Sequence, residues 1–335
     1  MTMPHEIGRM FWCGATPWHG LGTRLRELAT LDEALEHGGL DWSVSLAPVR
    51  VDENPPSAAP QRMAVVRDDR RPGDRERVLG VVHPRFVPLQ NRDGAAIFHR
   101  LLDLGERRYE TGGYLRGGEV VWLLARLPDE IVVGGDDRVE TYALWSNSHD
   151  GSRPIDIRLT TVRVVCRNTL SLALDARARL AFRRAHRHSA GRVEADARTF
   201  FRALRASIAE TKALFERLRA QPCDDAGFLR FVEMLLPEPA PPAGAPPGSA
   251  PAKAHAARVA NIHESRDAIA RLRREGLPAL GVPPEPRHWW GSINAVTGWV
   301  DHVQRVNGAR YAHALFGAGD RVKRRAMRLA EAVAS

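Results

Sequence analysis

One short run of the sequence holds the residue types that acid–base chemistry uses. Asn147, Ser148, His149 and Asp150 stand together before Gly151, at the end of an apolar, strand-like segment. A histidine is suited to act as a general base near neutral pH, and polar groups at strand ends often form sites. The same residue types favour a tight turn, so the run predicts either a turn or a polar site. The candidates for the polar site are Asn147, His149, Asp150 and Asn168.

Arginines lie before and after this run. A guanidinium grips phosphate through paired N–H donors, so such residues suit a nucleic-acid backbone or a phosphorylated small molecule. In the second case an arginine pair such as Arg163 and Arg167 would hold the phosphate beside His149. The candidate nucleic-acid contacts are Arg116, Arg153, Arg158, Arg163 and Arg167.

The positive charge of the chain is concentrated in its middle. The 335 residues carry a net charge of +9, and residues 151–220 hold 16 basic against 6 acidic side chains. A localised basic block is typical of a protein that binds a polyanion. The alternative is a solvated basic surface, because arginine outnumbers lysine strongly enough to indicate a coding bias.

Recognised catalytic and cofactor motifs are absent from the sequence. It holds no GxGxxG after a strand, no GxxxxGKS or GxxxxGKT, no HExxH, no GxSxG and no CxxC. The pairs His186/His188 and His302/His313 each lack a third ligand, so they predict no metal site. We therefore expect no catalytic residue, no cofactor and no metal.

The cysteines and the N-terminal residues indicate the cellular compartment that we expect for the protein. Cys13, Cys166 and Cys223 are widely spaced, which predicts reduced thiols in the cytoplasm. The first residues lack the pattern of a signal peptide, and no apolar run is long enough to span a membrane. We expect a cytoplasmic protein that does not associate with membranes.

The N-terminal part of the chain predicts strands and two helices. FWCGATPWHGLGTRL is rich in Gly and Trp without a period and predicts an ordered loop. Thr30 with Glu33 forms a capping-box pattern, and Gly38-Gly39 ends the short helix that follows. The remaining elements are strands at 42–51, 62–68 and 77–89 and a helix at 91–104.

The centre of the chain carries the clearest strand pattern. Two strands flank Arg116-Gly117-Gly118, a hairpin turn in which glycine supplies positive φ angles. Residues 120–125 are apolar on both faces, which predicts a central strand. A second hairpin joins 140–151 to 153–165, and 166–178 predicts a helix lying on the sheet.

The C-terminal part predicts helices. Apolar residues at alternating spacings of three and four form a heptad-like seam along 200–218, which would either dock within the chain or join two copies in a homo-oligomer. Residues 237–256 are rich in Pro, Ala and Gly and predict a disordered linker.

The fold class expected is α+β, with an antiparallel-rich central sheet over 42–165 backed by helices and followed by a helical C-terminal region. The domains expected are an α+β core at 1–190, amphipathic helices at 191–236, the linker at 237–256 and a helical module at 257–335.

Several multi-residue motifs, in order along the chain, carry a family resemblance. They include TPWHGLGT, ETGGYLRGGEVVWLLARLP, SNSHDGS, TTVRVVCRNTLSLAL and NAVTGWVDH. Together they resemble the phage/plasmid-like proteins catalogued as domain of unknown function 932. The resemblance implies an origin on a mobile element, and it supplies no catalytic residue to carry over.

Three hypotheses on function follow. The first is a non-catalytic nucleic-acid-binding protein that binds or anneals single-stranded DNA, since the predicted core is similar in outline to phage annealing proteins of the Red-beta and Erf class. The second is a nucleotide- or phosphate-directed enzyme that uses the His149/Asp150 strand end. The third is a structural or host-interaction protein.

Overall fold

A computed structural model describes residues 7–14, 22–51, 57–70, 72–74, 77–102, 106, 108–163, 169–171, 181–304, 313–314 and 317–334. The chain forms two compact units, and strands run from one into the other. The first unit holds 1–130, 141–160 and 178–207. The second holds 131–140, 161–177 and 208–335.

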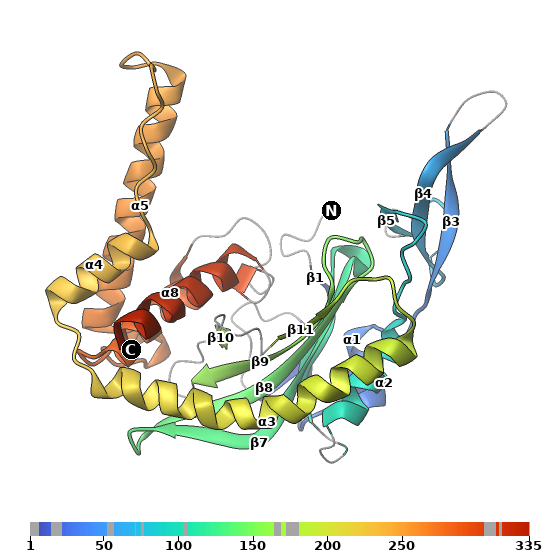
Figure 1. Cartoon of the computed structure of the whole chain (residues 1–335), viewed down its shortest axis with the longest axis horizontal. Coiled ribbons are helices and arrows are strands. Elements are labelled where there is room, and N and C mark those ends of the chain that lie inside the picture. The colour runs from blue at the N-terminus through green and yellow to red at the C-terminus, as the bar shows by residue number, and fades with distance from the viewer. Residues whose placement is uncertain are drawn as a thin grey trace. The chain divides into compact units, whose positions relative to one another are not determined.

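The fold is α+β, as predicted, and its strands form two sheets (Figure 1). The larger sheet has the order β10-β9-β8-β7-β6-β1-β2, and β11 also pairs with β9. The smaller sheet has the order β3-β4-β5. Its strands are β3 Val44–Val51, β4 Ser57–Arg67 and β5 Val78–Val82. Those of the larger sheet are β1 Ile7–Cys13, β2 Thr23–Leu25, β6 Tyr109–Leu115, β7 Val120–Val133, β8 Asp137–Ser148, β9 Ile155–Arg163, β10 Thr169–Ser171 and β11 Ala181–Arg184.

Antiparallel pairs dominate where the register is known. β1 with β6, β6 with β7, β11 with β9 and both pairs of the smaller sheet are antiparallel, and only β1 with β2 is parallel among these. The predicted hairpin is confirmed, because Leu115 pairs with Val120 across the turn η1 Arg116–Gly118. β8 and β9 are neighbours, as the second predicted hairpin requires.

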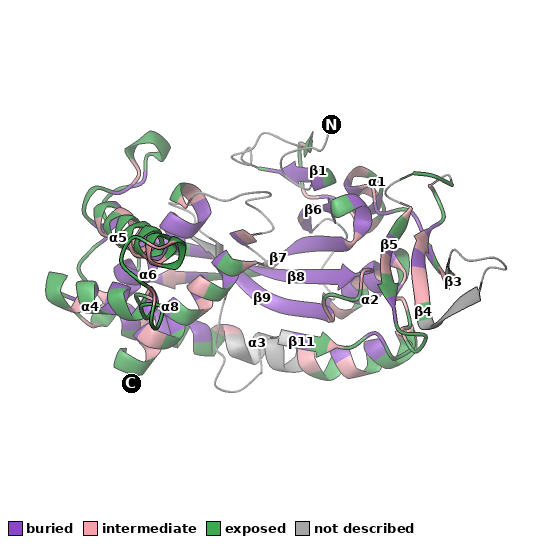
Figure 2. Cartoon of the chain, turned by 90° about the horizontal axis from the view of Figure 1, so that it is seen from above, coloured by how far each residue is buried: buried purple, intermediate pink, exposed green. Residues whose placement is uncertain are grey.

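The core of the first unit lies where both sheets and the first helices meet. Val120 to Ala125 of β7 are all buried, which confirms the central strand, and Figure 2 shows the buried middle strands in purple. Val121 and Leu123 belong to the same apolar cluster as Leu35, Phe98 and Trp145. This cluster joins β7 and β8 to the helices α1 Leu31–Gly38 and α2 Asn91–Leu102.

Helix α1 begins and ends where its capping residues predict. The Thr30 hydroxyl accepts from the amide of Glu33, and the Glu33 carboxylate accepts from the amide of Thr30 at 2.9 Å. Gly39 adopts the left-handed conformation that ends the helix. The capping box is thus confirmed on both sides.

The prediction of one sheet over 42–165 is wrong in its extent. β3, β4 and β5 form a sheet of their own, and β1 occupies the position beside β6. Residues Phe11 to Cys13, which we expected in a loop, belong to that strand. Period-two patterns identify strands but not their partners, because register and sheet membership depend on contacts far apart in sequence.

The predicted helix at 166–178 is wrong where the structure describes it, because Thr169–Ser171 form strand β10. The other residues of that segment lie outside the described residues. A short apolar run such as TLSLAL fits a buried strand as well as a helix, so its pattern alone does not decide between them.

The second unit is built on helices. They are the end of α3 Ala190–Ala220, followed by α4 Asp225–Leu235, α5 Ala250–Glu275, η2 Pro278–Leu280, α6 Trp289–Gly298, the π-helical turn η3 Trp299–Val303 and α8 Ala318–Ala334. Trp290 packs on Phe215 with ring centroids 4.3 Å apart and donates to Asp137 at 2.7 Å. Lys323 and Asp301 form a buried ion pair at 2.9 Å.

Residues 237–256 differ from the linker that we predicted. Helix α5 begins at Ala250 inside this segment, and the Ser249 hydroxyl caps it by accepting from the amide of Ala252. His255 lies 3.1 Å from the Pro239 carbonyl oxygen, so the Pro-rich segment runs beside the helix. Both flanks belong to the second unit, so no unit boundary falls here. Ser before Ala-Pro is a helix start that composition alone conceals.

The seam of α3 is buried within the chain at its described end. Thr211, Leu214, Phe215 and Leu218 are each at most 1% exposed. This burial favours docking of the seam within the chain, while self-association through 200–218 stays a prediction.

Candidate functional site

The first three residues of the polar run at the end of β8, Asn147, Ser148 and His149, are buried. His149 has no exposed surface, and its Nε2 lies 2.8 Å from Oδ1 of Asn91. Asn91 donates through Nδ2 to the carbonyls of Leu40 and Trp42, so Oδ1 must accept from His149. The neutral ring therefore carries its proton on Nε2.

Burial sets the protonation state of His149. Burial is the largest cause, and together with the electrostatic effects of His186 and Arg67, which Asp150 opposes, it lowers the pKa of His149 to about 3. Nδ1 is left as a buried acceptor without a hydrogen-bond partner among the described residues. His149 is thus neutral near pH 7 and serves to hold Asn91, whose amide ties α2 to the chain before β3.

Asn147 is also engaged in the packing of the fold. Its Nδ2 donates to the carbonyl of Leu89 at 2.9 Å, and the residue is 1% exposed. Asn147 and His149, two of the four candidates for a polar site, therefore face the interior.

Asp150 begins the turn that leads from β8 to β9. Its Oδ1 accepts from the Ser148 hydroxyl at 2.6 Å and from the amide and hydroxyl of Ser152 at 3.0 and 2.7 Å. Burial raises the pKa of Asp150, but these hydrogen bonds and the charge of Arg116 outweigh burial and lower it overall. Asp150 is thus an ionised carboxylate that shapes the turn.

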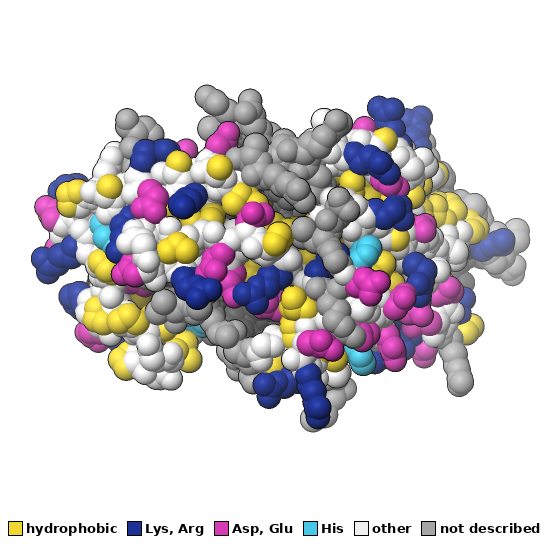
Figure 3. Space-filling model, turned by 90° about the horizontal axis from the view of Figure 1, so that it is seen from below, with side chains coloured by type: hydrophobic (Ala, Val, Ile, Leu, Met, Phe, Trp, Pro, Cys, Tyr) yellow, Lys and Arg dark blue, Asp and Glu magenta, His cyan; other side chains and the backbone are white. Residues whose placement is uncertain are grey.

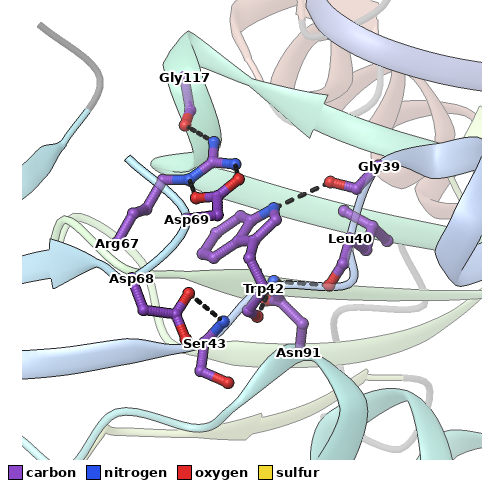
Figure 4. A network of polar contacts seen from close by, with 9 residues as sticks. All are labelled: Gly39, Leu40, Trp42, Ser43, Arg67, Asp68, Asp69, Asn91 and Gly117. Carbon is purple, nitrogen blue, oxygen red and sulfur yellow. Dashed lines mark hydrogen bonds and ion pairs between the residues drawn. The ribbon is translucent and has the colours of Figure 1, made fainter. Parts of the chain in front are cut away.

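A buried arginine organises the chain around Trp42 (Figure 4). Arg67, 2% exposed, donates to both carboxylate oxygens of Asp69 at 2.8 and 2.7 Å and to the carbonyl of Gly117. Its guanidinium lies 4.1 Å from the centre of the Trp42 ring, and Trp42 donates to the carbonyl of Gly39 at 2.8 Å. We call the buried residues Trp42, Arg67, Asn91 and His149, together with the exposed Asp69 that pairs with Arg67, the buried network.

The buried network holds the turn that carries Arg116. Arg116 has φ +47°, a strained value for a residue with a side chain, and its guanidinium pairs with Glu119. Gly118 has φ +115°, and a Cβ there would lie 2.8 Å from the Trp42 ring, so only glycine fits. The amide of His149 donates to the carbonyl of Glu119 at 2.8 Å, which places this turn beside the end of β8.

An open pocket of about 500 Å³ lies beside the Asp150 turn. Three chain segments line it: the end of β5 with the turn after it, the turn from β8 to β9, and the chain after β11. Its polar and aromatic lining consists of His83, Arg85, Phe86, Asp150, Ser152, Arg153, His186 and Arg187.

Arginines dominate the charge of this pocket. Arg85 and Arg187 are exposed, and no ion pair within the described part of the chain holds them. Burial, and then the charges of Arg116 and Arg158, lower the pKa of Arg153, with Asp150 and Asp156 opposing them. Three arginines thus face one carboxylate, and that carboxylate is already engaged by two serines.

A stacked pair of rings forms part of the wall. Phe86 and His186 have ring centroids 4.6 Å apart and an interplanar angle of 22°. His186 is 6% exposed, and burial lowers its pKa to about 4 although the backbones of Val87 and Arg153 oppose this. No hydrogen bond of normal geometry reaches its ring nitrogens within the described residues.

The five arginines predicted from sequence are placed differently. Arg153 lines the pocket, and Arg116 and Arg158 lie within electrostatic range of it. Arg158 is 7% exposed and pairs with Asp156 at 3.1 Å, so it is not a surface contact. The side chain of Arg163, and all of Arg167 and Asn168, fall outside the described residues.

Sequence reasoning missed Arg85, Phe86 and Arg187 and gave His186 no role beyond a weak metal-ligand candidate. The pattern that signals them is a basic, histidine-containing stretch after a strand, HPRF after β5 and HRH after β11.

Figure 3 shows one face of the molecule, where basic side chains (dark blue) are interspersed with acidic ones (magenta). The described basic side chains on that face therefore do not make a patch of one charge.

The described residues hold no group of three or more His, Cys, Asp or Glu side chains arranged to bind a metal ion. Within the same residues, no helix is both long enough and apolar enough to cross a membrane.

An α+β protein with an arginine-lined pocket is the class that the fold and the site define. The chain belongs to the family described as Domain of unknown function (DUF932), whose family model matches residues 78–333. A comparison with curated proteins and one with solved structures found no match. The matched region includes every residue of the pocket and excludes Trp42 and Arg67.

Proposed function

We propose that this chain binds single-stranded nucleic acid, most directly single-stranded DNA, without catalysis. The observation that supports the proposal is the pocket, whose lining includes Arg85, Arg153 and Arg187 together with Phe86. Proteins that bind single strands combine cationic side chains for the phosphates with aromatic rings on which bases stack. This pocket offers both kinds of side chain from three chain segments.

The arginines differ in the contact that each would make. Arg85 and Arg187 are exposed and reach phosphates from solvent, while Arg153 is half-buried in the wall. Arg116, on the turn beside Asp150, would extend the basic surface past the pocket. Arg158 would act through its charge, because Asp156 holds it in the interior. Arg163 and Arg167 stay proposed contacts from the sequence.

The enzyme hypothesis draws less support from the geometry. A general base must reach the proton that it removes. His149 is buried, and it does not line the pocket. Asp150 does line the pocket, but three hydrogen bonds from Ser148 and Ser152 occupy one of its oxygens.

The proposal is tested by titrating the protein into a fluorescently labelled single-stranded oligonucleotide at low salt and following anisotropy. The double variant Arg85→Ala/Arg187→Ala removes two exposed charges and should bind roughly tenfold or more weakly, whatever the base sequence. Arg258→Ala removes an exposed arginine on α5 and is the matched control, which should bind like the wild type. Equal affinities of the double variant and the control would contradict the proposal.

Annealing is the activity that we propose to follow from strand binding, in line with a mobile-element origin. Two complementary strands carrying a fluorescence donor and acceptor would report it. The wild-type protein should accelerate pairing, and the double variant should not. Strand binding without acceleration would restrict the proposal to binding alone.

A further inference from the structure

The size of the pocket limits what it can hold. Sites for small ligands occupy roughly 300–1,000 Å³, and this pocket measures about 500 Å³. A groove that binds many nucleotides of a nucleic-acid strand has no such upper limit on its volume. The volume suits one nucleotide rather than a length of strand.

The pocket is built from segments that are packed closely. Gly80 in β5 lies against the Asp150 turn, where a Cβ on Gly80 would come within 2.5 Å of the Asp150 Cα. The chain after β11 is tied to the segment after β5, because the amide of Val87 donates to the carbonyl of His186 at 2.8 Å. The three lining segments are therefore held together by backbone contacts.

The lining offers two kinds of chemistry. Arg85, Arg153 and Arg187 are cations suited to a phosphate. The stacked Phe86 and His186 supply aromatic surface, and His186 is a polar group more than nine-tenths buried in the wall. A neutral imidazole has one donor and one acceptor, which match a sugar hydroxyl or the edge of a base rather than a charge.

We infer that the pocket binds a single phosphorylated nucleoside, with the phosphate on the arginines and the base or sugar against Phe86 and His186. This inference rests on the proposed function and gives it a defined subsite. Such a unit is present both as a free nucleotide and at the end of a nucleic-acid strand that carries a 5′-phosphate. The shared chemistry is a phosphate next to a nucleoside.

The test is displacement of the labelled oligonucleotide by three competitors: a nucleoside 5′-monophosphate, the same nucleoside, and inorganic phosphate. The monophosphate should compete at concentrations roughly tenfold lower than either fragment, because stacking and charge act together only on that molecule. Oligonucleotides with and without a 5′-phosphate complete the set. Tighter binding of the phosphorylated strand would indicate a strand end, and equal binding would indicate the free nucleotide.

Two variants separate the halves of the pocket. Phe86→Leu keeps apolar volume without the ring. It should lower the affinity for the monophosphate roughly tenfold and leave the affinity for inorganic phosphate unchanged. Arg153→Ala should lower the affinity for both ligands, and Arg258→Ala should lower neither affinity. Thermal melting of each variant shows that it is folded before its affinity is compared.

Three outcomes would overturn the inference. If the oligonucleotide binds through the arginines but the monophosphate does not displace it, the inference fails and the proposed function stands. If the monophosphate competes no better than inorganic phosphate and Phe86→Leu has no effect, the pocket is a phosphate site only. If neither the oligonucleotide nor the monophosphate binds, both proposals fail.

Discussion

The buried network and the pocket lie in the same unit and use the same residue types, yet their environments differ. In the network, Arg67 is 2% exposed and is satisfied by Asp69, Gly117 and the Trp42 ring. In the pocket, Arg85 and Arg187 are exposed and no ion pair within the described residues engages them. An arginine beside an aromatic ring and a histidine is thus a structural element in one place and a candidate binding surface in the other.

The difference teaches that the partners of a charge, more than its residue type, indicate its role. Arg67 has exchanged its hydration for two carboxylate contacts and a carbonyl, so no ligand is needed to stabilise it. Arg85 and Arg187 keep their hydration, and they can exchange it for a phosphate. The predictions below test whether the two regions separate in this way.

The largest effect is expected from Arg67→Ala. Removing the guanidinium leaves Asp69 and the Gly117 carbonyl without their donor and a gap beside Trp42, so the free energy of unfolding should fall by about 3 kcal/mol. Urea denaturation measures this loss. Arg85→Ala, an exposed arginine of the pocket, should change stability by less than about 0.5 kcal/mol. Equal losses in the two variants would remove the distinction between the regions.

The second largest effect is the loss of folding stability at acid pH. The pKa of His149 is about 3 in the folded chain against 6.5 for an ordinary histidine, so the unfolded chain binds the proton first. The contribution of neutral His149 to the free energy of unfolding is therefore fully present above pH 6.5. It is lost as the pH falls from 6.5 toward 3. At pH 5 the loss from His149 alone should be about 2 kcal/mol.

His149→Gln isolates that contribution. The variant should be less stable than the wild type at pH 7, because it loses a buried ring. Its own decrease in stability between pH 7 and pH 5 should, however, be smaller by about 2 kcal/mol. Urea denaturation at the two pH values gives both numbers, and parallel decreases would show that His149 is not the group that titrates.

A smaller change in stability than in Arg67→Ala or at acid pH is expected from Arg116→Gly. Relief of the strained φ of +47° should leave the free energy of unfolding unchanged or raise it by up to about 1 kcal/mol. Strand binding should weaken at the same time, since the charge is lost. A variant that loses stability instead would show that the ion pair of Arg116 with Glu119 outweighs the backbone strain.

Local chemistry made part of this fold predictable. Thr30 with Glu33 predicted the start of α1, and the glycines at 117 and 118 predicted the hairpin between β6 and β7. Each of these signals depends on residues within a few positions of one another. Contacts at that range are set by the capping and turn preferences of the residues themselves.

The pocket could not be predicted in the same way. Phe86 and His186 stack, yet they are separated by 100 positions in the sequence. They meet because β11 pairs with β9 and the chain after it bonds to Val87, and neither fact is visible in a pattern of apolar residues. His149 shows the converse, since its sequence context suited a site but burial made it part of the network.

The most direct test of the account is the salt dependence of strand binding by the wild type and by Arg153→Ala. Contacts from Arg85, Arg116, Arg153 and Arg187 should give a slope of log affinity against log salt near −3, at roughly 0.7 per phosphate contact on a single strand. Arg153→Ala should bind more weakly and have a slope shallower by about 0.7. Absence of binding by the wild type at low salt, or an unchanged slope in the variant, would contradict the account.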